Sequence, residues 1–213
     1  MPIYNRIADF HEDLVATRRD IHAHPELGFE EHRTSDLVAQ QLESWGIEVH
    51  RNIATTGVVG VLKGSGNSKR SIGLRADMDA LPMDEEGTPE HRSKNAGKMH
   101  ACGHDGHTTM LLGAARYLAE TKNFDGTVHF IFQPAEEGGG GGRVMVEEGL
   151  FDKFECDTVW GMHNSPNLPA GTLAIRPGPL MAAVDMAKIT INAQGCHAAQ
   201  PHMGKDPIAV GVQ

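Results

Sequence analysis

Short β-rich runs alternate with amphipathic helical stretches along most of the chain, and this alternation limits the folds that are open to it. Runs of high strand propensity are separated by stretches in which apolar residues recur at helical spacing. Strands and helices that alternate in this way form a sheet whose two faces are covered by helices. The pattern therefore predicts an α/β fold with helices on both faces of the sheet.

The predicted elements follow one another with short connections. Helices are expected over residues 4–22, 30–45, 107–121 and 143–149, and a further helix from Asp206. Strands are expected over residues 47–53, 57–63, 71–76, 127–132, 157–162, 171–176 and 184–193. The pattern changes after Pro177-Gly178-Pro179, so we place a domain boundary near 180. Residues 181–213 are too few for an independent core and are expected to begin a smaller α+β domain.

Composition narrows the classes of function. The formal net charge of −9 argues against a nucleic-acid partner, because phosphate binding needs a basic face. No run approaches the ~20 apolar residues of a membrane span, so no membrane association is expected. The cysteines at 102, 156 and 196 are odd in number and widely spaced, which fits a reduced compartment better than a disulfide framework. These features favour a cytoplasmic protein.

One turn, residues 100–109, concentrates the residue types that bind metals: three histidines, a cysteine and an aspartate. Cys102 and His104 lie two residues apart on either side of a glycine, and an anionic sulfur can bridge two cations. The alternative is an ordinary buried cysteine beside a His-Asp pair at the start of a helix. Because no CxxC pair is present, the turn alone does not decide between the two interpretations.

Further potential ligands directly follow three of the predicted strands. They are Asp77, Asp79, Glu136, Glu137 and His163. In open α/β sheets, ligands bind in the crevice beyond the carboxyl ends of the strands, so these groups are able to converge. Four further histidines have no such placement and are interpreted from spacing as surface or structural residues: His22, His24, His197 and His202.

Each of these groups has a functional and an ordinary interpretation. One carboxylate of Glu136-Glu137 can bind a metal while the other takes a proton from a water; the alternative is a solvated acidic turn before the glycines at 138–142. Asp79 can accept the second N–H of a ligand histidine, or can merely initiate a turn. His163 can equally be a core histidine. The glycine run lacks the Gly-Lys-Ser/Thr of a phosphate loop, so we reject nucleotide binding.

Five motifs, in this order and spacing, are those of a known enzyme family. They are RDIHAHPE at 19–26, RADMDALP at 75–82, MHACGHDGH at 99–107, FQPAEE at 132–137 and GMHN at 161–164. On these motifs the sequence resembles, over essentially its whole length, the metal-dependent N-acyl-amino-acid amidohydrolases. These include hippurate hydrolase, aminoacylases and auxin-conjugate hydrolases, and are relatives of the co-catalytic metallo-carboxypeptidases. The resemblance implies a metallo-exopeptidase-like α/β catalytic domain over residues 1–180, with a mixed sheet and helices on both faces.

The resemblance also implies a site. Two divalent metal ions, of Mn, Zn, Co or Ni, would be held by Cys102, His104, Glu137 and His163. Glu136 would act as general base and acid, and Asp79 would orient a metal ligand. The implied reaction is hydrolysis of the amide bond of a small N-acyl amino acid by a metal-activated water. Alternatives are a di- or carboxypeptidase, an N-acetyl-diaminopimelate deacetylase, or a metal-binding chain without catalytic activity.

Residues 181–213 resemble the start of the family's satellite domain, which commonly mediates homodimerisation. His197 matches the satellite-domain histidine that stabilises the tetrahedral oxyanion, although Cys196 stands where the family usually has glycine. Family members are considerably longer, and their last metal-ligand histidine lies in a part beyond Gln213. We therefore expect the chain to be the N-terminal part of a longer enzyme, and to be inactive by itself.

Overall fold

The computed structural model describes residues 5–213, which separate into two compact units. The first unit extends to Ala170 and the second comprises Gly171–Gln213. The domain boundary expected near 180 remains a prediction.

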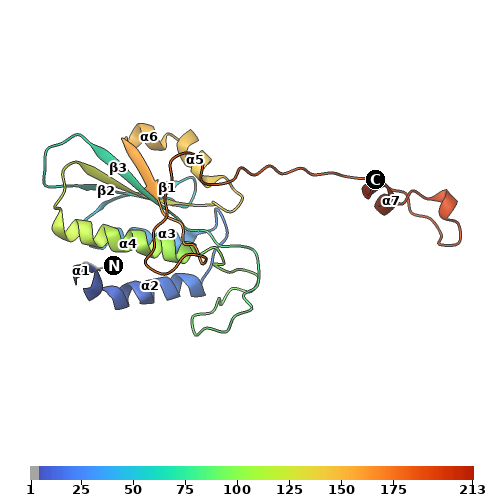
Figure 1. The fold of residues 1–213 in the computed structure, drawn as a ribbon, viewed down its shortest axis with the longest axis horizontal. Coiled ribbons are helices and arrows are strands. Elements are labelled where there is room, and N and C mark those ends of the chain that lie inside the picture. Colours follow the sequence, from blue (N-terminus) through green and yellow to red (C-terminus); the bar gives the residue numbers. More distant parts are fainter. Residues whose placement is uncertain (1–4) are drawn as a thin grey trace. The chain divides into compact units, whose positions relative to one another are not determined.

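A five-stranded mixed sheet forms the centre of the first unit (Figure 1). Its strands are β1 (Glu48–Ile53), β2 (Gly57–Lys63), β3 (Ser71–Asp77), β4 (Thr127–Gln133) and β5 (Thr158–Gly161). They lie in the order β1-β2-β4-β3-β5. β1 and β2 pair antiparallel, as do β2 and β4, whereas β3 is parallel to both β4 and β5. The mixed sheet predicted from the sequence is therefore confirmed.

Helices cover both faces of this sheet, as predicted (Figure 1). The helices are α3 (His32–Ser44) and α4 (His104–Thr121) on one face, and α5 (Gly141–Glu147) and α6 (Leu150–Lys153) on the other. Successive strand residues point to opposite faces. Phe130 and Phe132 accordingly pack in the core beneath α3 and α4, while Ile131 packs with Met145 of α5 and Leu150 of α6.

The prediction of one continuous helix over residues 4–22 is wrong. Tyr4 lies outside the described residues. Two helices occupy this stretch, α1 (Asn5–Asp9) and α2 (His11–Ala23), and α2 packs against α4. Phe10 between them leaves helical geometry, with φ −109° and ψ 20°. Its ring is buried, with the Arg116 guanidinium 4.3 Å from its centroid. Burial of this ring accompanies the break in the helix.

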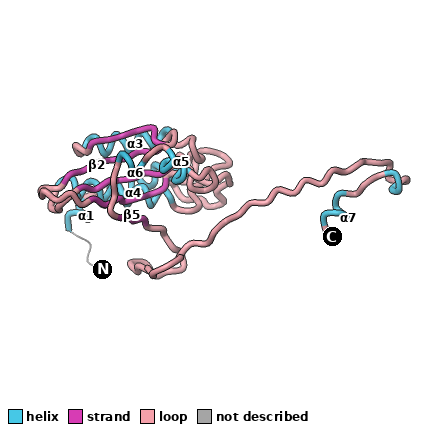
Figure 2. The backbone as a smooth tube through the Cα atoms, turned by 90° about the horizontal axis from the view of Figure 1, so that it is seen from above, coloured by secondary structure: helices cyan, strands magenta, loops and turns pink. Residues whose placement is uncertain are grey.

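The second unit is mostly loop (Figure 2). Its described elements are the 3₁₀ turn η1 (Pro201–Met203) and the predicted helix, α7 (Pro207–Gly211), which Asp206 caps by accepting a hydrogen bond from the Ile208 N–H. The strands predicted over 171–176 and 184–193 are wrong. An extended backbone becomes a strand only when a second backbone pairs with it, and within this unit the structure shows only an isolated bridge between Gln194 and Lys205.

None of the helices in the described part of the chain combines the length and the hydrophobicity that crossing a membrane requires.

Candidate metal centre

The candidate residues gather where three neighbouring parallel strands end. Asp77 pairs with Gln133 at the last position of the β3–β4 ladder, and β5 runs parallel along the other side of β3. Residues that follow these strands therefore emerge at one edge of the sheet, the usual place for a ligand in this kind of fold. The first turns of α4 lie against the same edge, because the Thr108 hydroxyl donates a hydrogen bond of 2.8 Å to the Asp77 carbonyl.

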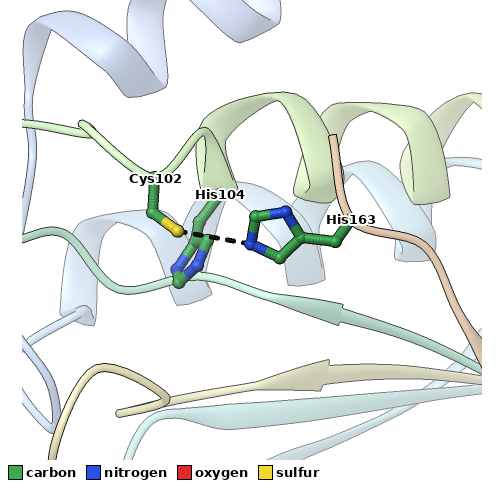
Figure 3. A group of neighbouring side chains, drawn as sticks. All are labelled: Cys102, His104 and His163. Carbon is green, nitrogen blue, oxygen red and sulfur yellow. Dashed lines mark hydrogen bonds between the residues drawn. The ribbon is translucent and has the colours of Figure 1, made fainter. Parts of the chain in front are cut away.

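Gly103 allows the turn before α4 to present two candidate ligands at once. Its backbone is left-handed, with φ 90° and ψ 20°, which a glycine adopts without steric cost. The side chains of Cys102, His104 and His163 converge, the last from the loop that follows β5 (Figure 3). Cys102 Sγ lies 3.3 Å from His163 Nε2. A Cβ on Gly103 would lie 2.6 Å from Asn164 Oδ1, so the position also lacks room for a side chain.

His104 presents a lone pair to the middle of this group. Its ring is fully buried, and Nδ1 donates a hydrogen bond of 2.8 Å to the Asp79 carbonyl while lying 3.3 Å from Asp79 Oδ1. Nδ1 therefore carries a proton, and in the neutral ring Nε2 is the acceptor. Among the described residues, Nε2 has no hydrogen-bond partner. A buried acceptor is costly to leave unpaired, and a metal cation would satisfy it.

Three carboxylates surround this nitrogen. His104 Nε2 lies 3.7 Å from Asp77 Oδ2, 3.8 Å from Glu137 Oε1 and 3.9 Å from Glu136 Oε2. Glu137 Oε1 is also buried and lacks a hydrogen-bond partner in the described chain. Imidazole, thiolate and carboxylate together are the donor set of zinc and similar divalent ions. The residues present therefore fit a divalent metal.

The electrostatics of the group favour a cation. Burial and the neighbouring Glu137 carboxylate raise the pKa of the Cys102 thiol to about 12. Burial alone would lower the pKa of His104, but its hydrogen bond with Asp79 and the carboxylates around it raise that pKa overall. The contributions of the carboxylates to both shifts reflect an excess of negative charge at the site. A divalent ion would neutralise this charge and deprotonate the thiol.

His107 connects the end of β3 to the loop that carries His163. Its Nδ1 lies 2.6 Å from Asp77 Oδ1, and its Nε2 accepts a hydrogen bond of 3.0 Å from the Asn164 backbone N–H. Burial would raise the pKa of Asp77, but the hydrogen bond with His107 and the charge of Arg75 hold it well below its usual range. The link to Asn164 was not predicted, because these residues are 57 apart in the sequence and nothing in their local pattern relates them.

Six of the seven predicted site residues come together in the first unit. They are Cys102, His104, Glu136, Glu137, His163 and, beside His104, Asp79. The seventh, His197, belongs to the second unit, where its Nδ1 accepts a hydrogen bond of 3.1 Å from the Ala199 N–H. The individual roles of all seven residues remain predictions.

Comparison with known proteins identifies the family. Residues 73–211, more than half of the chain, match the model of Peptidase family M20/M25/M40. The chain belongs to this family. It is 49% identical over 208 residues to the hippurate hydrolase of Campylobacter jejuni, a match that covers 98% of this chain and 54% of that protein. It is 43% identical to thermostable carboxypeptidase 1 of Saccharolobus solfataricus, covering 98% of this chain and 53% of that protein.

A solved structure from the same M20 family supports the fold assignment. The chain superposes on a Bacillus subtilis protein, described as a dinuclear metal binding peptidase, with a TM-score of 0.77 and 42% sequence identity. That match covers 81% of this chain and 48% of the other. The chain thus spans about half the length of the relatives it matches.

Proposed function

We propose that the protein of which this chain forms part hydrolyses the amide bond of small N-acyl amino acids with the help of two divalent metal ions. The observation that carries the proposal is the buried, unpaired His104 Nε2, which lies among the thiol, imidazole and carboxylate groups of the centre. Two relatives support it by their names: the hippurate hydrolase, which is about half identical, and the dinuclear metal binding peptidase.

The metal ions would be held by Cys102, His104, Glu137 and His163. When bound, divalent ions of Mn, Zn, Co or Ni would polarise the scissile carbonyl and lower the pKa of a water molecule. Asp79 would fix the orientation of the His104 ring, because its backbone carbonyl accepts a hydrogen bond from Nδ1. Its Oδ2 also accepts a hydrogen bond of 2.9 Å from the Glu137 N–H, which connects it to a second proposed ligand.

Glu136 is the proposed general base and acid. Its side chain is 43% exposed, in contrast to the fully buried His104 beside it, so it can reach both the centre and an incoming substrate. Its carboxylate takes a proton from the attacking water and returns it to the leaving amine. His197 would stabilise the oxyanion that develops on the carbonyl oxygen. Residues from 181 on would mediate a homodimer, and the free cysteines suit a cytoplasmic protein.

The proposal is tested by Glu136→Gln in the complete polypeptide that contains this chain. We expect the kcat for hippurate to fall by about 10²–10⁴-fold, the usual contribution of a general base. Metal content, measured by mass spectrometry, should stay at the wild-type value, because the substitution removes the proton acceptor and leaves the proposed ligands in place. The matched variant Glu137→Gln should instead lower the metal content. Undiminished turnover in Glu136→Gln, or no metal-dependent hydrolysis by the wild type, would contradict the proposal.

A second candidate, carboxypeptidase activity, is favoured by the 43% identity to the thermostable carboxypeptidase. A panel of benzoyl, acetyl and peptidyl derivatives of the same amino acid distinguishes the two. A kcat/KM that is highest for the benzoyl or acetyl compounds supports the amidohydrolase, and one that is highest for peptides supports the carboxypeptidase.

A further inference from the structure

Glu31 is a buried carboxylate that the proposed chemistry leaves without a role. It directly precedes α3, its side chain is inaccessible to solvent, and both of its oxygens are engaged. Oε2 accepts a hydrogen bond of 2.5 Å from the Thr56 hydroxyl, and Oε1 accepts one of 2.8 Å from the Ala135 N–H. Glu31 and Ala135 are 104 residues apart in the sequence. The neighbouring Glu30 is exposed and paired with Lys98, so burial distinguishes the two adjacent glutamates.

Ala135 has an unfavourable backbone conformation directly before the proposed general base. Its φ is 50°, in the left-handed region that a residue with a Cβ seldom adopts. Such a conformation persists only where the surroundings enforce it. Its N–H is bound by Glu31 and its carbonyl accepts a hydrogen bond of 3.0 Å from the Gly141 N–H.

Close packing also holds Ala135 in place. A Cβ on Gly28 would lie 2.9 Å from the Ala135 Cα, and a Cβ on Gly139 would lie 2.7 Å from its Cβ. The backbone of the Gly28 segment therefore approaches Ala135 as closely as the absence of a side chain allows. Glu31 lies three residues further along that segment. Among the described residues, its carboxylate is the only group that accepts a hydrogen bond from the Ala135 N–H.

The backbone angles of Ala135 determine the direction in which the next residue, Glu136, leaves the chain. A displacement of a reacting group by about 1 Å can cost 10²-fold in rate. We infer that Glu31 is a positioning residue for Glu136, since its Oε1 holds the Ala135 N–H and with it the strained turn that aims the general base. The inference rests on the proposed function of Glu136. Burial raises the pKa of Glu31, but Oε1 can accept the hydrogen bond in either protonation state.

Four variants of the complete, metal-loaded polypeptide test this role. Glu31→Leu removes the acceptor and keeps much of the side-chain volume, whereas Glu31→Gln keeps an acceptor oxygen for Ala135 and an amide that can donate to Thr56. Thr56→Val removes the second hydrogen bond and leaves the Ala135 contact. Glu30→Gln is the exposed control. For each variant, kcat and KM for hippurate, metal content and the hydrogen exchange of the Ala135 amide are measured.

We expect Glu31→Leu to lower kcat by about 10²-fold with KM and metal content unchanged, and to accelerate exchange at Ala135 by about tenfold or more. Glu31→Gln should restore kcat to within about fivefold of the wild type, and the other two variants should stay within about threefold. Wild-type kcat in Glu31→Leu, a loss that merely follows metal content, or unchanged exchange at Ala135 would overturn the inference. A wild-type protein without hydrolytic activity would overturn the proposed function instead.

Discussion

Among single residues, the proposed ligand Cys102 is expected to make metal binding depend on pH. Burial and Glu137 raise the pKa of its thiol to about 12, so in the metal-free protein the sulfur is protonated throughout the neutral range. Only the thiolate is a ligand, so binding must release this proton, and affinity must rise with pH by about tenfold per unit for each proton released. Calorimetric titration with Zn²⁺ between about pH 6 and pH 8, in buffers of different ionisation enthalpy, counts the protons.

A control for this prediction is available in the same chain. Cys156 is also free and partly buried, but it is not among the ligand groups. Cys156→Ala should leave the number of released protons unchanged, and Cys102→Ala should reduce it by one and weaken binding. A zinc affinity that does not vary with pH would show that the Cys102 thiol is not a ligand.

The residues of the centre differ in how far the sequence could predict them. His163 and Glu137 were predicted as candidates because they follow β-rich runs, and parallel strands carry such residues to one edge. Glu31 was not predicted to have a functional role, because Glu30-Glu31 looks like a solvated acidic pair at the start of a helix. Its role depends on a backbone N–H 104 residues away, and contacts of that range follow from the packed fold and not from any local pattern.

At the scale of elements, the start of α4 supports a prediction on two glycines of the same turn. Gly103 is left-handed, and a Cβ there would lie 2.6 Å from Asn164 Oδ1, whereas Gly106 lies inside the helix with open space around it. Gly103→Ala should therefore cost about 1–2 kcal/mol in unfolding free energy. Gly106→Ala should stabilise the protein by about 0.5–1 kcal/mol, because alanine favours the helix. Urea unfolding measures both.

The same two variants distinguish an effect on stability from an effect on metal binding. To accommodate a Cβ at position 103, the side-chain amide of Asn164 must move. Because Asn164 directly follows the proposed ligand His163, we expect the affinity for Zn²⁺ to fall by about 10–100-fold in Gly103→Ala. In Gly106→Ala it should equal that of the wild type. Equal zinc affinities in the two variants would contradict the geometry described for this turn.

Strand prediction succeeded or failed according to whether a partner backbone exists. The run at 57–63 has two neighbours, β1 and β4, and forms a strand with the predicted bounds. The run at 184–193 has comparable strand propensity but no paired backbone in the described part of the chain. Propensity reports that a segment fits a sheet, and the hydrogen bonds that make it a strand come from elsewhere in the fold.

For the whole molecule, the division into two units predicts which properties survive truncation. The entire five-stranded sheet and the ligand groups that converge in the structure lie before Gly171. A variant that ends at Ala170 should therefore unfold cooperatively, with a midpoint within a few degrees of that of the 213-residue chain. It should also bind Zn²⁺ with the same stoichiometry, measured by calorimetry beside thermal unfolding followed by circular dichroism.

Loss of zinc binding on removal of residues 171–213 would show that the second unit contributes a ligand or stabilises the first, contrary to this prediction. His197→Ala in the 213-residue chain is the matched control. His197 is proposed to act on the oxyanion and not on the metal, so this variant should bind Zn²⁺ like the wild type. If both changes leave zinc binding intact, the first unit supplies the zinc ligands that this 213-residue chain contains, and any requirement for residues 171–213 concerns catalysis or assembly.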